Sequence, residues 1–343
     1  MTLRIAINGF GRIGRGVLRA LVESGETDIE IVAINDLAPP QNIAHLLKYD
    51  SVHGRLGVPV LVDDDQLRVG EHSIRLTAIR NPEDLPWQDV DIAYECTGLF
   101  TDREAAARHL QNGSKRVLIS APGKNADKTV VYGVNHRDLT ADDVIVSNAS
   151  CTTNCLAPVA LVLDREFGIK TGYMTTIHAF TGDQPSHDTN HKDLYRARAA
   201  SMSMVPTSTG AARAIALVLP RLEGRLEGSA VRVPTPNVSM VDLCFMPERP
   251  VTRDEINAAV AKAAAHELAG VLSFEEDPLV SIDFNHDPHS SCFAAAQTTV
   301  TQEGMVRVVS WYDNEWGFSN RMIDTGRIMG ALLQTAAPLK LAG

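Results

Sequence analysis

The sequence predicts a protein of two α/β domains, in which a doubly wound, mostly parallel sheet is followed by an α+β domain with a mixed or antiparallel sheet. Three observations carry this prediction. Over residues 1–150, short apolar runs alternate with helix-like stretches, which is typical of a parallel sheet with helices on its faces. A glycine-rich segment joins the first apolar run to the first helix-like stretch. After residue 167 longer loops separate the strand-like runs, and 343 residues leave room for two cores.

The glycine-rich segment lies in the first predicted βαβ unit. A strand is expected at residues 3–8, and an amphipathic helix follows residues 9–14, whose sequence GFGRIG matches G-x-G-x-x-G. Gly9 permits the tight turn, Gly11 lets the backbone approach a pyrophosphate, and Gly14 lets the helix pack closely on the strand. The pyrophosphate would then rest on the helix N-terminus. The segment therefore predicts a Rossmann-type dinucleotide-binding domain.

An acidic residue follows the second predicted strand, at residues 29–34. Asp36 lies 22 positions beyond Gly14, where a carboxylate can bond the hydroxyls of the adenosine ribose. The same charge repels a 2′-phosphate. Asp36 therefore favours NAD over NADP as the cofactor.

The rest of the first domain continues the alternation. Residues 55–80 alternate polar and apolar side chains with turn signals, which predicts short antiparallel strands inserted into the domain. A helix is expected at residues 102–110, with Asp102 and Glu104 in its first turn. Ligands of doubly wound sheets bind at the carboxyl ends of the strands, so residues that follow these strands should face the cofactor. Further strands are expected at residues 90–96, 117–120, 129–134 and 144–146.

A cysteine follows the last of these strands. Ser150 occupies the position of an N-cap, and Cys151 is then the first residue of a helix that extends to residue 167. Unpaired amides and the positive end of the helix dipole favour a thiolate there, and the same amides can hold an oxyanion. Cys151 is therefore a candidate nucleophile. The alternative from the same pattern is a small buried cysteine in a strand-to-helix turn.

The second domain is predicted to follow at residues 151–317. Residues 180–203 form a long polar loop, and Ser and Thr side chains begin a helix near residue 209, which is a natural phosphate cradle. A C-terminal helix at about residues 318–336 is expected to pack back on the first domain, residues 1–150. The remaining elements are expected to be strands at residues 173–178, 230–233, 240–245, 292–300 and 306–312 and a helix at residues 253–268.

Composition excludes several classes of protein. The net charge of −10 argues against a nucleic-acid or anionic-membrane partner, because these select basic surfaces. No apolar run approaches the roughly 20 residues of a membrane span, and no signal-peptide pattern precedes the first strand. Five scattered cysteines without a CxxC pair do not resemble a disulfide framework. A soluble protein of the cytoplasm is expected.

Taken together, these residues resemble phosphorylating glyceraldehyde-3-phosphate dehydrogenases of the bacterial type. The resemblance covers essentially the whole chain. The match around Cys151 extends over a dozen residues and is far more specific than the glycine motif. The resemblance rests on residues 7–14, 147–158, 175–178, 207–212, 232–239 and 311–315.

The resemblance implies a reaction and the residues that perform it. Cys151 would attack the aldehyde of glyceraldehyde 3-phosphate to form a thiohemiacetal. His178 would lower the thiol pKa as an ion-pair partner and act as general base while a hydride leaves for NAD. Inorganic phosphate would attack the resulting thioester and release 1,3-bisphosphoglycerate. The implied sites are Thr181, Asp183 and Arg232 for the substrate phosphate; Ser150, Thr152, Arg196, Thr209 and Gly210 for the attacking phosphate; and Gly9, Gly11, Arg12, Ile13, Gly14, Asp36, Arg80, Ser120 and Asn314 for the cofactor.

Single residues of this set also have plainer interpretations. His178 could be a structural histidine, an arginine such as Arg232 could form a salt bridge, and Thr209 could only cap a helix. Cys155 shares a helix face with Cys151 and is interpreted as a buried neighbour, because no further ligands lie at zinc spacing. No metal site is expected.

The chain departs from the family pattern at three places. Thr189-Asn190 replaces the usual Leu-Pro that helps to exclude NADP, so strictness for NAD rests on Asp36. Phe318 replaces a common tyrosine, and residues 283–290 resemble erythrose-4-phosphate dehydrogenases. Residues 208–212 nevertheless keep the Ser-Thr-Gly-Ala-Ala of the triose enzymes, which favours the three-carbon substrate.

Three alternatives remain open at this point. An erythrose-4-phosphate dehydrogenase would hydrolyse its thioester and would not depend on added phosphate. A non-phosphorylating aldehyde dehydrogenase would need no second anion site, against which Arg196 and Thr209 count. An inactive nucleotide- or RNA-binding relative would not need Cys151 and His178.

The family resemblance also implies a homotetramer, with residues 180–203 as a subunit-contacting loop.

Overall fold

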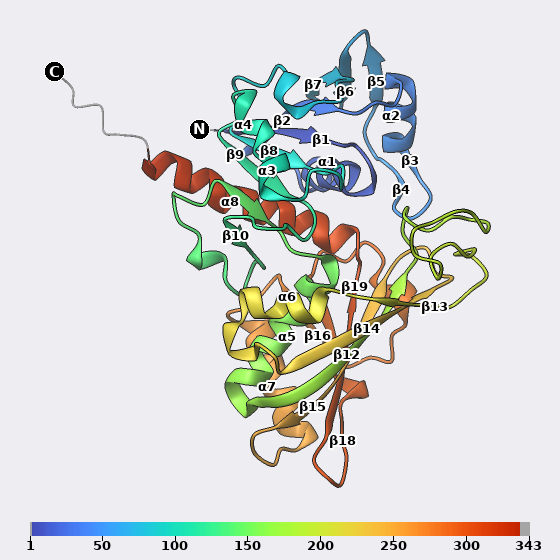
Figure 1. Ribbon diagram of the computed structural model, residues 1–343, viewed down its shortest axis with the longest axis vertical. Helices are drawn as coiled ribbons and strands as arrows, with labels where there is room; N and C mark the ends of the chain where they lie inside the picture. Colours follow the sequence, from blue (N-terminus) through green and yellow to red (C-terminus); the bar gives the residue numbers. More distant parts are fainter. Residues whose placement is uncertain (1, 337–343) are drawn as a thin grey trace, which may run out of the picture. The chain divides into compact units, whose positions relative to one another are not determined.

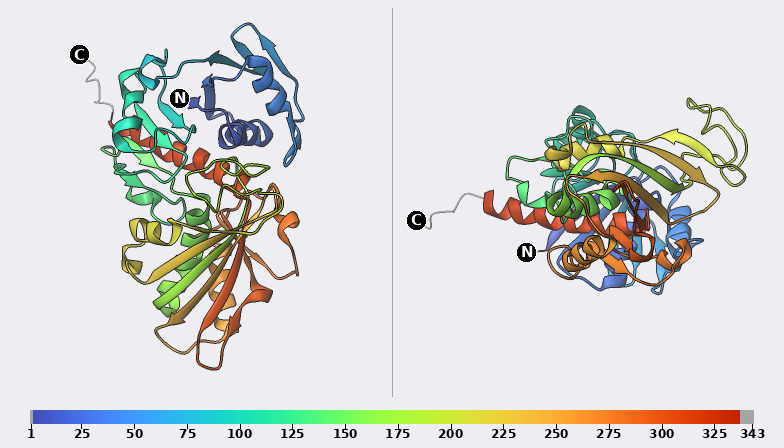
Figure 2. Two further views of the ribbon diagram at one scale, coloured as in Figure 1. Left: turned by 45° about the vertical axis from the view of Figure 1, so that its right-hand side comes forward. Right: turned by 90° about the horizontal axis from the view of Figure 1, so that it is seen from below.

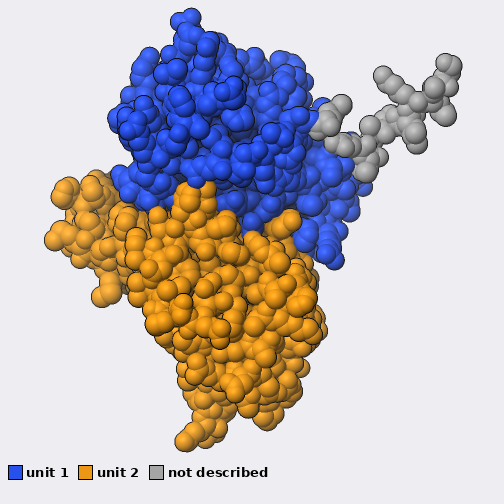
Figure 3. All heavy atoms as spheres, turned by 180° about the vertical axis from the view of Figure 1, so that it is seen from behind, with its two compact units in different colours: residues 1–130, 135–149, 319–343 blue, residues 131–134, 150–318 orange. Residues whose placement is uncertain are grey.

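The computed structural model describes residues 2–336, and the chain divides into two compact units (Figure 3). Unit 1 contains the chain up to Val130, residues Asn135–Ala149 and the chain from Ser319 onward; unit 2 contains Val131–Val134 and Ser150–Phe318. None of the helices within residues 2–336 combines the length and hydropathy needed to cross a membrane.

Unit 1 is built on a nine-stranded sheet (Figure 1). Its order is β10-β11-β9-β8-β1-β2-β7-β6-β5. The seven strands from β10 to β7 pair in parallel, and β7, β6 and β5 pair antiparallel. The strands are β1 (Leu3–Asn8), β2 (Ile29–Asn35), β5 (Val60–Asp63), β6 (Gln66–Val69), β7 (His72–Thr77), β8 (Ile92–Glu95), β9 (Arg116–Ile119), β10 (Lys128–Thr129) and β11 (Ile145–Ser147).

The order of the strands reverses at β1. This strand pairs in parallel with β2 on one side and with β8 on the other, and its last four residues are buried. A reversal of this kind leaves a crevice at the carboxyl ends of the strands, where ligands of doubly wound sheets bind. The helices of the unit are α1 (Arg12–Ser24), α2 (Pro40–Lys48), α3 (Arg103–Ala106) and α4 (Arg108–Gln111), and a small ribbon is formed by β3 (Tyr49–Asp50) and β4 (Gly54–Arg55).

The strand predicted at residues 129–134 is mostly absent. Only Lys128–Thr129 forms β10, and the amide of Val134 bonds the carbonyl oxygen of Val131 at 3.0 Å, which makes a turn. Gly133 has a φ of +87°, a conformation outside the β region, and this ends the extended backbone. The apolar pattern of these residues therefore reflects burial in a turn.

Unit 2 contains a mixed eight-stranded sheet, whose twisted strands are visible in Figure 2. Its order is β13-β14-β12-β15-β19-β17-β16, with β18 paired to β19. The pairs β12–β14 and β16–β17 are parallel and the others are antiparallel. The strands are β12 (Ile169–Ala179), β13 (Val205–Ser208), β14 (Leu226–Val233), β15 (Ser239–Pro247), β16 (Leu272–Glu275), β17 (Ser291–Ala294), β18 (Thr299–Val300) and β19 (Val306–Tyr312).

A buried helix anchors unit 2. Helix α5 (Cys151–Phe167) begins at the cap Ser150, and most of its residues are buried against β15, β17, β19, α6 (Ala211–Val218) and α7 (Arg253–Ala265). Pro158 lies inside this helix. The first residue of this helix, Cys151, lies beside His178 of β12.

The C-terminal helix α8 (Trp316–Ala336) belongs to unit 1 from Ser319 onward. The hydroxyl of Tyr94 on β8 donates to the carbonyl oxygen of Met322 at 2.9 Å, and the hydroxyl of Thr325 donates to Asn148 at 2.8 Å. A side chain at Gly326 would overlap the Tyr94 hydroxyl, at 1.8 Å. Only glycine permits this close approach of α8 to the sheet.

Candidate active site

The candidate nucleophile lies at the first residue of α5. Ser150 has extended backbone, and its hydroxyl accepts a hydrogen bond from the amide of Thr153 at 3.0 Å, which caps the helix. Cys151 thus stands beside the unpaired amides of the first turn. Its Sγ atom lies 3.5 Å from Nε2 of His178, which is on β12. The structure therefore brings together the two residues predicted to be catalytic.

The hydrogen bonds of His178 fix the protonation of its ring. Nδ1 lies 2.7 Å from the carbonyl oxygen of Ala179, a distance that requires a proton on Nδ1. Nη1 of Arg232 donates to the same carbonyl at 3.0 Å and lies equally close to Nδ1. In the neutral ring the lone pair is therefore on Nε2 and faces the thiol of Cys151. This is the orientation that a general base for the thiol needs.

Burial controls the protonation of the pair. Burial of the ring, reinforced by the charge of Arg232, lowers the pKa of His178 to about 3. Burial also raises the pKa of the Cys151 thiol, and the charge of Arg232 and a hydrogen bond from Thr152 only partly oppose this. The thiol pKa was expected to be lowered by the helix terminus and by His178. Burial instead acts against the thiolate, and it also keeps the imidazole of His178 neutral near pH 7.

Arg232 lies beside His178 because of strand register. His178 on β12 is paired with Arg232 on the parallel strand β14, and Arg232 also faces Val205 on β13. The Nε atom of Arg232 is buried and has no hydrogen-bond partner among residues 2–336. A buried guanidinium N–H without an acceptor is a donor available to an anion.

The other residues predicted for the substrate phosphate lie in the loop after β12. Asp183 accepts from Nη1 of Arg196 at 2.8 Å and lies 3.3 Å from Nε2 of His191. Burial alone would raise the pKa of Asp183, but these two partners outweigh it and lower the pKa. Asp183 and Arg196 were predicted for different phosphate sites, and the structure joins them directly. Thr207 adds a contact that the sequence did not indicate, since its hydroxyl accepts from Nε of Arg196 at 3.1 Å.

Apart from Arg196, which bonds Asp183 and Thr207, the residues predicted for the attacking phosphate form two local groups. Ser150 and Thr152 are at the start of α5, where the Ser150 hydroxyl is engaged in the cap. Thr209 and Gly210 are at the start of α6, where the Thr209 hydroxyl accepts from the amide of Ala211 at 3.1 Å. Each group places hydroxyls and helix amides together, as an anion site requires.

A buried tyrosine beside the catalytic pair was not predicted. The hydroxyl of Tyr312 lies 2.9 Å from the hydroxyls of both Thr152 and Thr176, and its ring meets His178 edge-on at 5.8 Å. These contacts link α5 to β12 next to Cys151. In the sequence, Tyr312 stood out only as part of residues 311–315, one of the segments that carry the family resemblance.

Asn314, the residue predicted to orient the nicotinamide, is buried in unit 2. Its Oδ1 accepts from the hydroxyl of Ser239 at 2.7 Å, and Ser239 accepts from the amide of Ala179 at 3.0 Å. Asp313 holds the turn by accepting from the amides of Glu315 and Trp316. The bond from Ser239 fixes which end of the Asn314 amide is the oxygen. The Nδ2 group of Asn314 therefore points away from Ser239.

Unit 1 contains a cavity of about 480 Å³ at the carboxyl ends of its strands. Four predicted cofactor residues line it: Gly9, Gly11, Asp36 and Arg80. The other predicted residues of unit 1 lie outside the lining, namely Arg12, Ile13, Gly14 and Ser120. Of these, Arg12 forms a two-pronged ion pair with Asp50, and Ser120 follows β9 at the same edge of the sheet.

The three glycines of the first turn have different roles. A side chain on Gly9 would meet the amide nitrogen of Thr97 at 2.6 Å, and one on Gly14 would meet the carbonyl oxygen of Gly9 at 2.4 Å. Gly11, by contrast, has open space around the position of a side chain and lines the cavity. The turn therefore keeps room beside α1 for a ligand, which fits a pyrophosphate.

Asp36 holds the glycine turn as well as facing the cavity. Its two carboxylate oxygens accept from the amide of Phe10 at 2.8 Å and from the amide of Ala38 at 2.9 Å. The carboxylate keeps further acceptor positions, because each oxygen has more than one lone pair. Its place fits contact with ribose hydroxyls.

Among the described residues, three side chains of types that bind metals lie close together outside the candidate active site. Asp287, His289 and Cys292 place one potential ligand atom each within 4.8 Å of one another. Nδ1 of His289 lies 2.8 Å from the Asp287 carboxylate, so this pair is also explained as an ion pair within the loop. The sequence expectation of no metal stays a prediction.

Comparison with known proteins agrees with this description. The family description "Glyceraldehyde 3-phosphate dehydrogenase, NAD binding domain" matches residues 3–103, and "Glyceraldehyde 3-phosphate dehydrogenase, C-terminal domain" matches residues 150–314. Glyceraldehyde-3-phosphate dehydrogenase of Cereibacter sphaeroides is 65% identical over 333 residues, which cover 97% of this chain and 100% of that protein. The enzymes of Xanthobacter flavus and Geobacillus stearothermophilus are 62% and 56% identical over 97% and 94% of this chain, and cover 100% and 97% of those proteins.

A dinucleotide-binding sheet and a cysteine–histidine pair, together with these matches, define an NAD-dependent dehydrogenase. The chain belongs to the glyceraldehyde-3-phosphate dehydrogenase family. The predicted fold class, family and cofactor are confirmed, and the relatives do not favour the alternatives considered from the sequence. The roles of individual residues stay predictions.

Proposed function

We propose that this chain oxidises glyceraldehyde 3-phosphate with NAD and transfers the acyl group to inorganic phosphate, forming 1,3-bisphosphoglycerate. One observation carries the chemistry: the lone pair of a neutral His178 faces the thiol of Cys151 at 3.5 Å, at the N-terminus of α5. A base and a nucleophile in this relation suit covalent catalysis at a carbonyl carbon.

The first steps use the groups around the thiol. Nε2 of His178 accepts the thiol proton as Sγ of Cys151 forms a bond to the aldehyde carbon, which gives a thiohemiacetal. The amides at the start of α5 stabilise negative charge on the former carbonyl oxygen. His178 returns this proton to that oxygen, which completes the hydroxyl group of the thiohemiacetal, and accepts it again as the carbon loses a hydride and becomes a thioester. When NAD is bound, it supplies the acceptor for the hydride.

Inorganic phosphate completes the reaction in this proposal. A phosphate oxygen attacks the thioester carbon, the carbon–sulfur bond breaks, and the sulfur of Cys151 leaves with the electron pair. The substrate phosphate is assigned to Arg232, Thr181 and Asp183, supported by the buried, unpartnered Nε of Arg232. The attacking phosphate is assigned to the hydroxyls, amides and guanidinium of Ser150, Thr152, Arg196, Thr209 and Gly210.

Cofactor binding is assigned to the residues of the glycine turn and the cavity of unit 1, with Asn314 of unit 2 orienting the nicotinamide amide. The open space at Gly11 and the cavity-facing Asp36 support this assignment. The assigned residues are Gly9, Gly11, Arg12, Ile13, Gly14, Asp36, Arg80, Ser120 and Asn314.

We also propose a cytoplasmic homotetramer. All five cysteines are free, which fits a reducing compartment. The loop after β12 exposes four large apolar side chains, which fits a loop that another subunit covers. These are Leu194, Tyr195, Met202 and Met204, exposed by 81%, 63%, 80% and 75%. Light scattering behind a sizing column measures the subunit number, and a monomer would overturn the assembly proposal.

The test of the function is NADH formation with and without inorganic phosphate. Glyceraldehyde 3-phosphate is expected to turn over in a phosphate-dependent manner, and Cys151→Ser is expected to abolish turnover. Erythrose 4-phosphate serves as the competing substrate. Phosphate-independent turnover of the tetrose, with little turnover of the triose, would contradict the proposal. So would turnover of the triose that survives Cys151→Ser.

A further inference from the structure

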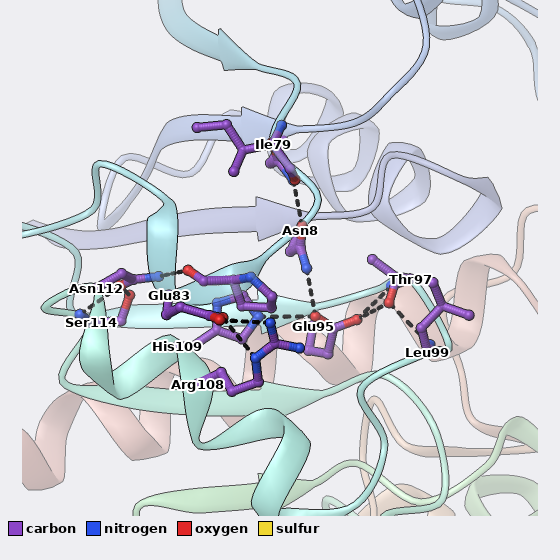
Figure 4. Close-up of polar contacts among 12 residues, drawn as sticks. Asn8, Ile79, Glu83, Glu95, Thr97, Leu99, Arg108, His109, Asn112 and Ser114 are labelled. Atoms are coloured by element: carbon purple, nitrogen blue, oxygen red, sulfur yellow. Dashed lines mark hydrogen bonds and ion pairs between the residues drawn. The ribbon is translucent and has the colours of Figure 1, made fainter.

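A buried acidic residue bonds two of the residues that line the cavity of unit 1, Asn8 and Thr97 (Figure 4). Glu95 is the last residue of β8 and is 1% exposed, and His109 on α4 is fully buried. Nε2 of His109 lies 2.9 Å from Oε2 of Glu95. Neither residue lines the cavity, and the proposed reaction assigns no role to either.

The carboxylate of Glu95 accepts four hydrogen bonds. Its Oε2 accepts from Nδ2 of Asn8 at 2.7 Å and from His109. Its Oε1 accepts from the amide of Thr97 at 2.8 Å and from the Thr97 hydroxyl in a short contact. The hydroxyl proton must point at Glu95, because the Thr97 oxygen itself accepts from the amide of Leu99 at 3.0 Å. A carboxylate accepts from all four neighbours at once when Nε2 of His109 carries the ring proton.

These bonds hold both walls of the cavity. Asn8 and Thr97 line it from the ends of β1 and β8. Asn8 in turn accepts from Nδ2 of Asn35 at 2.8 Å, and the same Nδ2 donates to the carbonyl oxygen of Ile79 at 2.8 Å. Asn35 and Ile79 are also lining residues. A continuous chain of side-chain bonds thus runs from Glu95 across four neighbouring strand ends.

His109 is placed by its own surroundings. Its ring stacks on Trp87, with centroids 5.5 Å apart and an angle of 8° between the planes. Its Nδ1 is buried without a hydrogen-bond partner among the described residues, so the bond to Glu95 is the ring's only polar contact there. Asn112 stabilises the turn after α4, because its Nδ2 donates to the carbonyl oxygen of Pro82 at 2.8 Å. The hydrogen bond of the His109 ring therefore serves to orient the carboxylate of Glu95.

We propose that Glu95, oriented by His109, is a positioning residue for NAD, which sets the positions of Asn8 and Thr97 in the cofactor cavity. This inference rests on the cofactor site proposed above. It adds two residues that do not touch the cavity and predicts that they govern affinity for NAD. A buried carboxylate held by four hydrogen bonds is suited to fix cavity walls in this way.

The test is Glu95→Gln, followed by titration calorimetry with NAD. The glutamine NH₂ replaces one oxygen and faces two donors in either orientation. At the Oε1 position it opposes the backbone amide of Thr97, which cannot reverse. At the Oε2 position it opposes Asn8, whose rotation would break the bond to Asn35. A wall residue must move in both cases, and we expect the Kd for NAD to rise at least about tenfold.

Glu83→Gln is the matched control. Glu83 makes a two-pronged ion pair with Arg108, the residue before His109, at 2.6 and 2.7 Å, and does not line the cavity. The same change of charge at this accessible site is expected to leave the Kd for NAD unchanged. His109→Phe is the second variant, since it keeps an aromatic ring against Trp87 and removes only the donor. It is expected to raise the Kd for NAD in the same direction as Glu95→Gln.

A purely structural role predicts a different result. In that case the variants lower the unfolding temperature but bind NAD like the wild type. A positioning role predicts a raised KM for NAD, with KM for glyceraldehyde 3-phosphate and kcat at saturating NAD within about threefold of wild type. Wild-type protein that does not bind NAD would overturn the cofactor site itself. Wild-type binding with an unchanged Kd in both folded variants would overturn the positioning role and leave the cofactor site standing.

Discussion

His178 and Arg232 face each other across two parallel strands, and both bond the carbonyl oxygen of Ala179. This arrangement turns the Nε2 lone pair of His178 toward Cys151 and adds a positive charge beside the site. The charge and the burial keep His178 neutral, because both lower its pKa. A neutral base therefore stands next to the thiol at physiological pH.

Replacement of this base is expected to slow the reaction without unfolding the protein. His178→Asn keeps a polar side chain of similar size but removes the proton acceptor. We expect kcat to fall by about 10²–10⁴-fold, the usual contribution of a general base. Steady-state NADH formation measures this, with circular dichroism as the control for folding. A kcat within a few-fold of wild type would exclude His178 as the base.

Two glycines of the first turn make a matched pair. Gly14→Ala places a methyl group against the backbone oxygen of Gly9, which cannot move aside, so we expect lower stability as well as weaker NAD binding. The methyl group of Gly11→Ala would contact no protein atom. We therefore expect the free energy of unfolding to change by less than about 1 kcal/mol, while NAD binding weakens. Thermal unfolding and NAD titration separate the two effects. Equal NAD affinity for wild type and Gly11→Ala would place the pyrophosphate elsewhere.

The charge of Asp36 is expected to set the preference for NAD. Asp36→Asn removes the charge and keeps one acceptor for the amide of Phe10 or Ala38. We expect the ratio of kcat/KM for NADP to that for NAD to rise by about tenfold, since repulsion of the 2′-phosphate is relieved. Initial rates with both cofactors give this ratio. An unchanged ratio would mean that other residues exclude NADP.

The Arg12–Asp50 ion pair is expected to make stability depend on pH. Burial would raise the pKa of Asp50, but bonds from Arg12 and from the amides of His53 and Val52 outweigh it and lower the pKa below its ordinary value of 3.8. The unfolded chain therefore binds the proton first, so this stabilisation is complete above pH 3.8 and is lost as the pH falls below it.

Asp50→Asn tests that sign. The variant is expected to be less stable than wild type by about 1–2 kcal/mol at pH 7, and the difference should shrink at pH 3. Urea unfolding at both values measures it. A difference that is the same at pH 7 and pH 3 would show that the carboxylate charge of Asp50 does not contribute.

The parts of the fold that could be predicted are those with local signals. The strand at Leu3–Asn8, the glycine turn and the start of α5 at Cys151 follow from periodicity, steric demands and capping, which act over a few residues. The strand predicted at residues 129–134 was wrong for the same reason. The apolar pattern of these residues is typical of a strand, but Gly133 adopts a positive φ that ends the extended backbone. The apolar pattern does not indicate that conformation.

The contacts that shape the sites join residues far apart in the sequence. Asn8 and Glu95 are 87 positions apart, and Thr152 and Tyr312 are 160 apart. Their partners depend on the order of strands in each sheet, which no local pattern specifies. The pKa values of Cys151 and His178 likewise depend on burial by distant elements, and burial raises the thiol pKa where the position at the helix terminus predicted a lower one.

The central claim is that the oxidised substrate is held on Cys151 as a thioester. The most direct measurement is a single turnover with glyceraldehyde 3-phosphate and NAD in the absence of inorganic phosphate, quenched and analysed by peptide mass spectrometry. We expect a burst of about one NADH per chain, with an equal amount of acyl adduct on the peptide that contains Cys151. Added phosphate should remove that adduct. A full burst of NADH with no adduct on Cys151, or with the adduct on another residue, would contradict the account.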